Sequence, residues 1–211
     1  MKYVFSLFIM FFAVHISVYS QSKINDIKNG ALLVRIQTNQ HLIDHYVKDK
    51  LLDKTNTFTY HSNNDSIRII HILPQKKSDA IKTKQSHLNK DIINAFETEW
   101  SLSPVYYFYS NFSNEIRNNI FTNVFKADKT KLSAKEKSQL NNNFLIAYIG
   151  DTPGSLKFNA LVLTDRNFKT LAHPWPKYVR TYDGLWFLKR KLSKSIQILE
   201  KKLDFQLSRI K

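Results

Sequence analysis

The chain has 211 residues, a length typical of one domain or two small ones. It carries 32 Lys and Arg against 17 Asp and Glu, a formal net charge of +15, and it contains no cysteine. The missing cysteine excludes disulfide bonds, a thiol nucleophile and any cysteine-ligated metal. Hydrophobic residues make up 43% of the chain and aromatic residues 13%. These fractions are too high for an intrinsically disordered protein.

The first 20 residues follow the pattern of a secretory signal peptide. Lys2 supplies a positive charge, residues 3–14 form an almost unbroken apolar run, and Val18 and Ser20 suit positions −3 and −1 of a cleavage site. The apolar run is shorter than the ~20 residues needed to cross a bilayer, which favours cleavage after Ser20 over the alternative of a retained membrane anchor. We therefore predict a periplasmic or secreted protein whose mature part, residues 21–211, is a single α/β domain ending in a long helix.

The first half of the mature chain alternates apolar runs with helical periodicity. The predicted elements are a strand at 31–36, a helix at 38–54, a loop at 55–65, a strand at 66–73 ended by Pro74, a helix at 78–100 and a strand at 105–109. The last of these, Val105-Tyr106-Tyr107-Phe108-Tyr109, is hydrophobic on both faces, which predicts a central position in its sheet.

The second half continues the alternation. The predicted elements are a short helix at 113–121 capped by Ser113, a polar surface excursion at 125–143, a strand at 144–149, a hairpin of 159–164 with 168–171, an aromatic loop at 173–184 and a helix at 184–210. Helices alternating with buried strands predict an α/β fold, a mixed sheet with covering helices. The order of elements is thioredoxin-like, but the redox C-x-x-C motif is absent, so dithiol chemistry is not expected.

Three segments carry a family resemblance: the signal peptide ending in S-Q, the stretch P-V-Y-Y-F-Y-S-N-F-S, and F-N-A-L-V-L-T-D-R-N-F-K-T-L-A-H-P-W-P-K-Y-V-R-T-Y. With these segments the chain resembles a family of small exported proteins of Bacteroidetes type. The resemblance implies export and supports the fold, and it carries no catalytic residues over to this chain.

Recognisable catalytic and cofactor motifs are missing. The sequence has no G-x-G-x-x-G, no G-x-x-x-x-G-K-[ST] and no G-x-S-x-G. His41 and His45 stand four apart on a predicted helix, a spacing that can bind zinc, but no third ligand is evident. We therefore predict no cofactor and no metal.

Polar residues at the carboxyl ends of predicted strands form the first candidate site. Ser110 follows the 105–109 strand and Asp151 follows the 144–149 strand, where open α/β sheets bind ligands. With His173 they define a candidate region for an enzyme. The alternative is that these residues are ordinary caps and turn formers.

The loop His173-Pro174-Trp175-Pro176-Lys177-Tyr178-Val179-Arg180-Thr181-Tyr182 forms the second candidate site. Two prolines stiffen the backbone around Trp175, and Trp, Tyr and Arg are enriched at binding hot spots, which makes Trp175, Tyr178 and Arg180 candidate ligand-binding residues. The alternative is that Trp175 and Tyr178 tuck under the loop and pin the last helix.

The C-terminal helix carries an apolar stripe from Leu185 to Ile210 at helical spacing and a strong positive charge. Its length predicts that the first half, with Trp186 and Phe187, packs on the sheet and that the second half overhangs. The overhang would serve self-association or contact with an anionic membrane surface. Alternatively, the 78–100 helix covers the stripe within the chain.

Two function hypotheses follow. The first is an exported, non-catalytic binding or accessory domain of the cell envelope, with an envelope protein, a glycan or an anionic surface as partner. The second is an envelope hydrolase or transferase that acts on a glycan or peptide through Ser110, Asp151 and His173. We do not expect nucleic acid as a partner, because the positive charge comes mainly from Lys and because base and phosphate recognition favour Arg.

Overall fold

The computed structural model describes residues 29–40, 42–44, 60–62, 65–67, 73–141, 143–182 and 187–209. The chain divides into two compact units, residues 1–36 with 92–211 (unit 1) and residues 37–91 (unit 2). The predicted signal peptide and both zinc-spaced histidines, His41 and His45, lie outside the described residues. None of the helices in the described part is long and apolar enough to cross a membrane.

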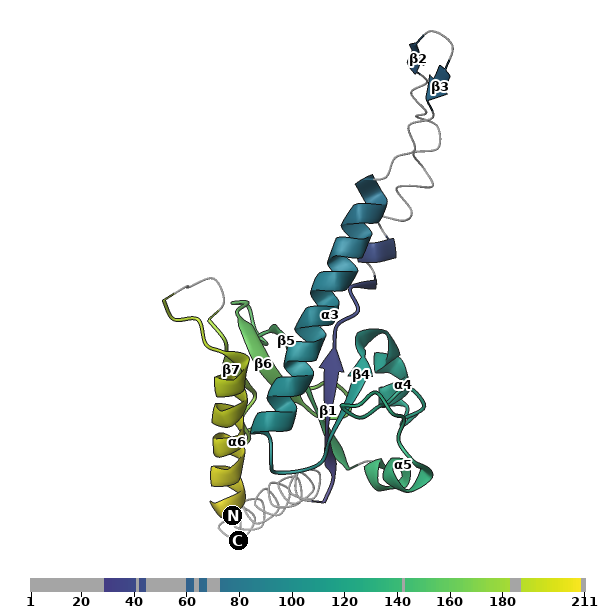
Figure 1. The fold of residues 1–211 in the computed structure, drawn as a ribbon. Coiled ribbons are helices and arrows are strands. Elements are labelled where there is room, and N and C mark those ends of the chain that lie inside the picture. The colour runs from purple at the N-terminus through teal and green to yellow at the C-terminus, as the bar shows by residue number, and fades with distance from the viewer. Residues whose placement is uncertain are drawn as a thin grey trace, which may run out of the picture. The chain divides into compact units, whose positions relative to one another are not determined.

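Unit 1 is built on a five-stranded mixed sheet, which confirms the predicted α/β class (Figure 1). The strand order is β4 (Val105–Tyr109), β1 (Ala31–Ile36), β5 (Phe144–Asp151), β6 (Asn159–Thr164) and β7 (Tyr178–Arg180). Strand β1 runs parallel to both β4 and β5, whereas β6 is antiparallel to β5 and to β7. The helices whose bounds lie within the described residues are α3 (Leu73–Glu99), α4 (Ser113–Arg117), α5 (Ala134–Leu140) and α6 (Leu192–Arg209), with a 3₁₀ turn at Ser110–Phe112.

Helices cover both faces of this sheet, because alternate residues of β1 enter two different cores. Leu32, Val34 and Ile36 pack with the end of α3 and with α6. Ala31 and Leu33 face the opposite way and pack with side chains of α4, α5 and the segment between them. An apolar run that is buried on both faces is typical of an interior strand, and β1 lies between β4 and β5.

The predicted central position of the 105–109 strand is wrong, since β4 lies at the edge of the sheet. The outer side of β4 is not left open, however. Tyr107 and Phe125 exchange both backbone hydrogen bonds, at 2.8 and 2.9 Å, and their rings stack with centroids 6.2 Å apart. A covered edge can be as apolar as an interior strand, which explains the error.

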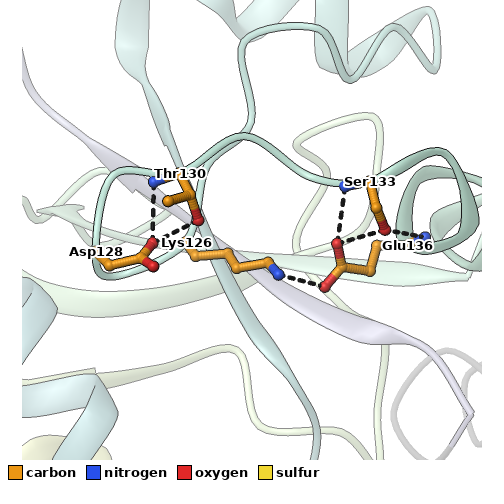
Figure 2. A network of polar contacts seen from close by, with 5 residues as sticks. All are labelled: Lys126, Asp128, Thr130, Ser133 and Glu136. Carbon is orange, nitrogen blue, oxygen red and sulfur yellow. Dashed lines mark hydrogen bonds and ion pairs between the residues drawn. The ribbon is translucent and has the colours of Figure 1, made fainter.

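The polar network in Figure 2 stabilises the segment that covers β4, residues 125–136. The Lys126 ammonium lies 2.8 Å from Glu136 Oε1, while Glu136 Oε2 accepts hydrogen bonds from the backbone and hydroxyl of Ser133. Ser133 in turn caps α5 in a reciprocal capping box. Asp128 accepts two hydrogen bonds from Thr130 and closes the preceding turn. The ion pair with Lys126 and the bonds from Ser133 lower the pKa of Glu136 to about 2.

The antiparallel pairing differs from the predicted hairpin. Strand β6 pairs with β5, and residues 165–169 form a tight turn that is followed by a single bridge between Thr164 and Thr170. The segment 168–171 is therefore not a strand. Instead, β7 forms within the predicted aromatic loop and supplies the outer neighbour of β6.

The C-terminal helix is shorter than predicted and packs differently. It begins at Leu192, because Arg190 is held to β7 by hydrogen bonds to the carbonyl oxygens of Thr181 and Arg180. Phe187 is 66% exposed, so the predicted packing of the first half is wrong for that residue.

The predicted overhang of the second half is also wrong. Leu199, Leu203 and Leu207 are buried in the core of unit 1. Gln197 donates a 2.6 Å hydrogen bond to Glu99, and Glu200 accepts one from Ser101, so the helix lies beside the end of α3. The stripe residues Ile196, Leu199, Leu203 and Leu207 are therefore buried within the chain, whereas Leu188 is 51% exposed.

Unit 2 contains the two-stranded antiparallel pair β2 (Tyr60–Ser62) and β3 (Asp65–Ile67) and residues of α3 up to Asp91. Helix α3 starts at Leu73, so Pro74 stands in its first turn, where a missing N–H costs nothing, rather than ending a strand. A chain of side-chain amides runs through this unit: Asn39 donates to Gln85, Gln85 to Asn89, and Asn89 to the carbonyl oxygen of Gln37.

Candidate functional site

A half-buried arginine near the carboxyl end of β1 is the centre of the site. Arg35 follows Leu33 by two residues and therefore lies on the face covered by α4 and α5. Its Nε donates a 3.0 Å hydrogen bond to the hydroxyl of Ser113, and that hydroxyl donates a 2.6 Å bond to the carbonyl oxygen of Ser110. The start of α4 thus fixes the guanidinium at the end of the sheet where the parallel strands finish.

Aromatic rings and a second arginine surround this guanidinium. The Arg35 guanidinium carbon lies 5.8 Å from the ring centroid of Tyr148 on β5 and 6.0 Å from that of Phe168. The guanidinium of Arg117, at the end of α4, lies 4.9 Å from the centroid of the same Phe168 ring. One aromatic ring therefore contacts both cations, at distances typical of cation–π interactions.

Local backbone geometry places the two rings. Phe168 has a φ of +60°, in the left-handed region, and the turn that holds it is closed by Asp165, whose carboxylate accepts hydrogen bonds from the backbone of Asn167 and Lys169. Tyr148 lies along β5 over Gly150, where a Cβ atom would approach the tyrosine ring to 3.0 Å. Gly150 thus leaves room for this ring.

The site has positive charge without a matching negative charge. Burial lowers the pKa of the Arg35 guanidinium, Tyr148 raises it, and the neighbouring Arg117 lowers it further. Burial also raises the pKa of the Tyr148 hydroxyl, which Arg35 partly opposes. No carboxylate among the described residues forms an ion pair with either arginine, and no described acceptor takes a hydrogen bond from the Nη groups of Arg35. The arrangement can bind an anionic group, since two adjacent guanidinium groups attract a shared negative charge.

The structure does not assemble Ser110, Asp151 and His173. Ser110 directly follows β4 and Asp151 ends β5, two strand spacings away in the sheet, about 10 Å at ~4.8 Å each, whereas His173 lies in the connection between β6 and β7. His173 also follows Thr164, which pairs with Ile146, five residues before Asp151 along β5. Ser110 contributes to the site with its carbonyl oxygen, and Asp151 is exposed at the end of β5. The register therefore keeps the histidine away from the other two.

The three candidate residues of the aromatic loop differ in how far they are buried. Trp175 is only 3% exposed and packs in the core shared with α3 and α6, so the prediction of a surface anchor is wrong for this residue. Tyr178 is half-buried on β7, where it pairs with Val162. Arg180 is exposed, and its guanidinium carbon lies 4.6 Å from the ring centroid of Phe158. The tucked-loop alternative thus holds for Trp175, while Arg180 remains on the surface.

Sequence reasoning missed Arg35, Arg117, Tyr148 and Phe168. One signal was available: Arg35 interrupts the apolar run A-L-L-V-R-I at a position that a buried strand leaves to an apolar residue. Nothing in the sequence pattern joins Phe168 to it, because their contact depends on the turn at 165–169. Within the described parts of the chain, no group of three or more His, Asp or Glu side chains is placed to hold a metal ion.

No family model, no curated protein and no solved structure matches the chain. The resemblance to small exported Bacteroidetes-type proteins stays a prediction from the sequence.

Proposed function

We propose that this chain is an exported, non-catalytic binding or accessory domain of the cell envelope, and that it binds an anionic group at the Arg35 site. The observation that supports this best is a half-buried arginine, Arg35, beside a second arginine, Arg117, with no carboxylate partner among the described residues. Two like charges near each other and partly desolvated are unfavourable until an anion joins them.

The ligand chemistry follows from the groups present. The free edges of two guanidinium groups suit a carboxylate, phosphate or sulfate, which accept paired hydrogen bonds from arginine. Tyr148 and Phe168 supply apolar contact beside the charge. The position at the carboxyl ends of parallel strands is also where open α/β sheets bind their ligands.

Binding is the function we prefer over catalysis because Ser110 and Asp151 end strands that are two positions apart in the sheet, while the connection that carries His173 follows the opposite end of β6. Export is supported by the signal-peptide pattern of residues 1–20. The thioredoxin-like order also stays a proposal, supported by the parallel β1–α3–β4 connection, the antiparallel β5–β6 pair and the closing helix α6.

Inorganic phosphate is a direct probe of the site. We expect phosphate to raise the melting temperature of the wild type saturably, because a ligand at 100 times its Kd stabilises the folded state by about 2.7 kcal/mol. The variant Arg117→Gln should lose most of this rise. Its side chain is exposed, so the fold should be unaffected.

Arg209→Gln is the matched control, because Arg209 is also an exposed helical arginine, with its guanidinium 5.3 Å from the ring of Phe205. The rise in melting temperature that phosphate causes in this variant measures the general stabilisation that phosphate gives to any folded protein. Equal rises in the wild type and in both variants would contradict the proposed site.

A further inference from the structure

Four of the eight large apolar side chains that are exposed among the described residues gather at one end of unit 1. These are Leu156 at 71%, Phe158 at 42%, Phe187 at 66% and Leu188 at 51% exposure. They come from the β5–β6 connection and from the segment before α6, which Figure 1 shows at the same end of the sheet. We call residues 151–159, 178–182 and 187–194 together the hairpin-end surface.

Side-chain and backbone contacts join these segments into one surface. The Arg180 guanidinium lies over the Phe158 ring, and the carbonyl oxygen of Arg180 accepts a 2.8 Å hydrogen bond from the Arg190 side chain. The Arg190 guanidinium carbon lies 5.1 Å from the Tyr182 ring centroid, and its backbone N–H bonds to Thr181. The hairpin connection, the end of β7 and the residues leading into α6 are therefore contiguous.

The surface is strongly basic. Within its residues stand six cations, Lys157, Arg180, Lys189, Arg190, Lys191 and Lys194, against the single carboxylate of Asp151. Leu188, Lys191 and Lys194 also line a shallow concave patch with Gln197. Apolar side chains that reach outward between cations are the arrangement by which proteins lie on anionic bilayers.

We infer that the hairpin-end surface docks on an anionic lipid bilayer, with Leu156, Phe187 and Leu188 entering the headgroup region and the lysines facing lipid phosphates. A lipid surface fits better than a soluble polyanion, which gains nothing from exposed Leu and Phe. It also fits better than a protein partner, because lysine is depleted at the centre of protein interfaces. The sequence suggests the apolar stripe of the C-terminal helix as a membrane contact. Leu199, Leu203 and Leu207 of that stripe are buried within the chain, so the hairpin-end surface is the contact inferred instead.

The cysteine-free chain allows a site-specific test that does not depend on what other segments do at a membrane. Leu156→Cys and Leu188→Cys are each labelled with an environment-sensitive fluorophore and mixed with vesicles of phosphatidylglycerol and phosphatidylcholine. Phe205→Cys is the matched control, because Phe205 is a 57% exposed apolar residue farther along α6, about 20 Å from the helix start at 1.5 Å per residue.

We expect a blue shift for the labels at positions 156 and 188 but not at position 205. The shift should disappear with pure phosphatidylcholine vesicles and weaken at high salt. Lys191→Gln/Lys194→Gln should weaken the shift at position 188 several-fold, whereas Lys201→Gln/Lys202→Gln, two exposed lysines of the same helix, should not. Thermal melts of each labelled protein establish that it is folded.

Three results would overturn the inference. The first is an unchanged emission at positions 156 and 188 in the presence of anionic vesicles, even if the protein sediments with them. The second is an equal shift at position 205, which indicates adsorption without a defined face. The third is binding of dextran sulfate that depends on Lys191 and Lys194 without any vesicle-induced shift, which indicates a soluble polyanion as partner.

Discussion

Leu203→Ala tests whether the C-terminal helix belongs to the core of unit 1. Leu203 is fully buried among side chains of α3 and the sheet. Removing three carbons at about 0.8 kcal/mol each costs about 2.4 kcal/mol. Incomplete collapse of the vacated space adds about 1 kcal/mol, so the loss should be about 3.5 kcal/mol, within the range for buried leucines.

The assay is equilibrium urea unfolding followed by tryptophan fluorescence, since Trp100 and Trp175 lie in the same core as Leu203. The midpoint should fall without a change in the slope of free energy against urea. In a thermal scan the same loss corresponds to a lower Tm by about 7 to 14 °C for a chain of this size.

Phe205→Ala provides the control on the same helix, because Phe205 is more than half exposed. It should change the unfolding free energy by less than about 0.5 kcal/mol. If Leu203→Ala cost less than Phe205→Ala, or if it changed self-association rather than stability, the burial of the stripe in the monomer would be refuted.

Three further predictions concern packing and capping. Trp175→Ala should lower the free energy of unfolding by about 3 to 5 kcal/mol, measured by urea unfolding, because the Trp175 side chain lies in the core. A loss below about 1 kcal/mol would contradict the burial of Trp175. Ser133→Ala should cost about 1 kcal/mol through loss of the capping box, whereas Ser138→Ala, at an exposed position inside the same helix, should be neutral or slightly stabilising in thermal melts. Glu136→Gln should lower stability at neutral pH, and the difference from wild type should shrink as pH falls from about 4.5 toward 2. The sign follows because the folded-state pKa of Glu136 is depressed to about 2, so its contribution is present above the ordinary carboxyl pKa and is lost on protonation; a difference independent of pH would contradict it.

The strands were the most predictable part of the chain. Residues 31–36, 144–149 and 159–164 are strands as expected, because an apolar run of six residues with β-branched or aromatic members has few other ways to be buried. Boundaries that depend on distant partners were less predictable. Helix α6 begins eight residues later than its apolar periodicity predicts, because Arg190 bonds to β7.

The candidate site was only partly accessible from the sequence. The carboxyl end of the parallel strands was the expected place, and Ser110 does lie there, but its contribution is a carbonyl oxygen held by Ser113. The side chains that define the site, those of Arg35, Arg117 and Phe168, come from three segments that no short-range pattern joins. Conversely, the conspicuous Trp175 is buried, because a motif rich in Pro and Trp does not reveal whether its aromatic ring faces the core or the surface.

The class of fold, the absence of thiol chemistry and the strong positive charge follow from the sequence alone, because each depends on composition or on local periodicity. Three further features come from tertiary packing: β4 is a covered edge strand, Leu199, Leu203 and Leu207 of α6 are buried in the core, and two arginines contact one aromatic ring. These facts depend on which segments meet across the sheet, and contacts between residues far apart in the chain are set by the packing of the whole core rather than by any local pattern.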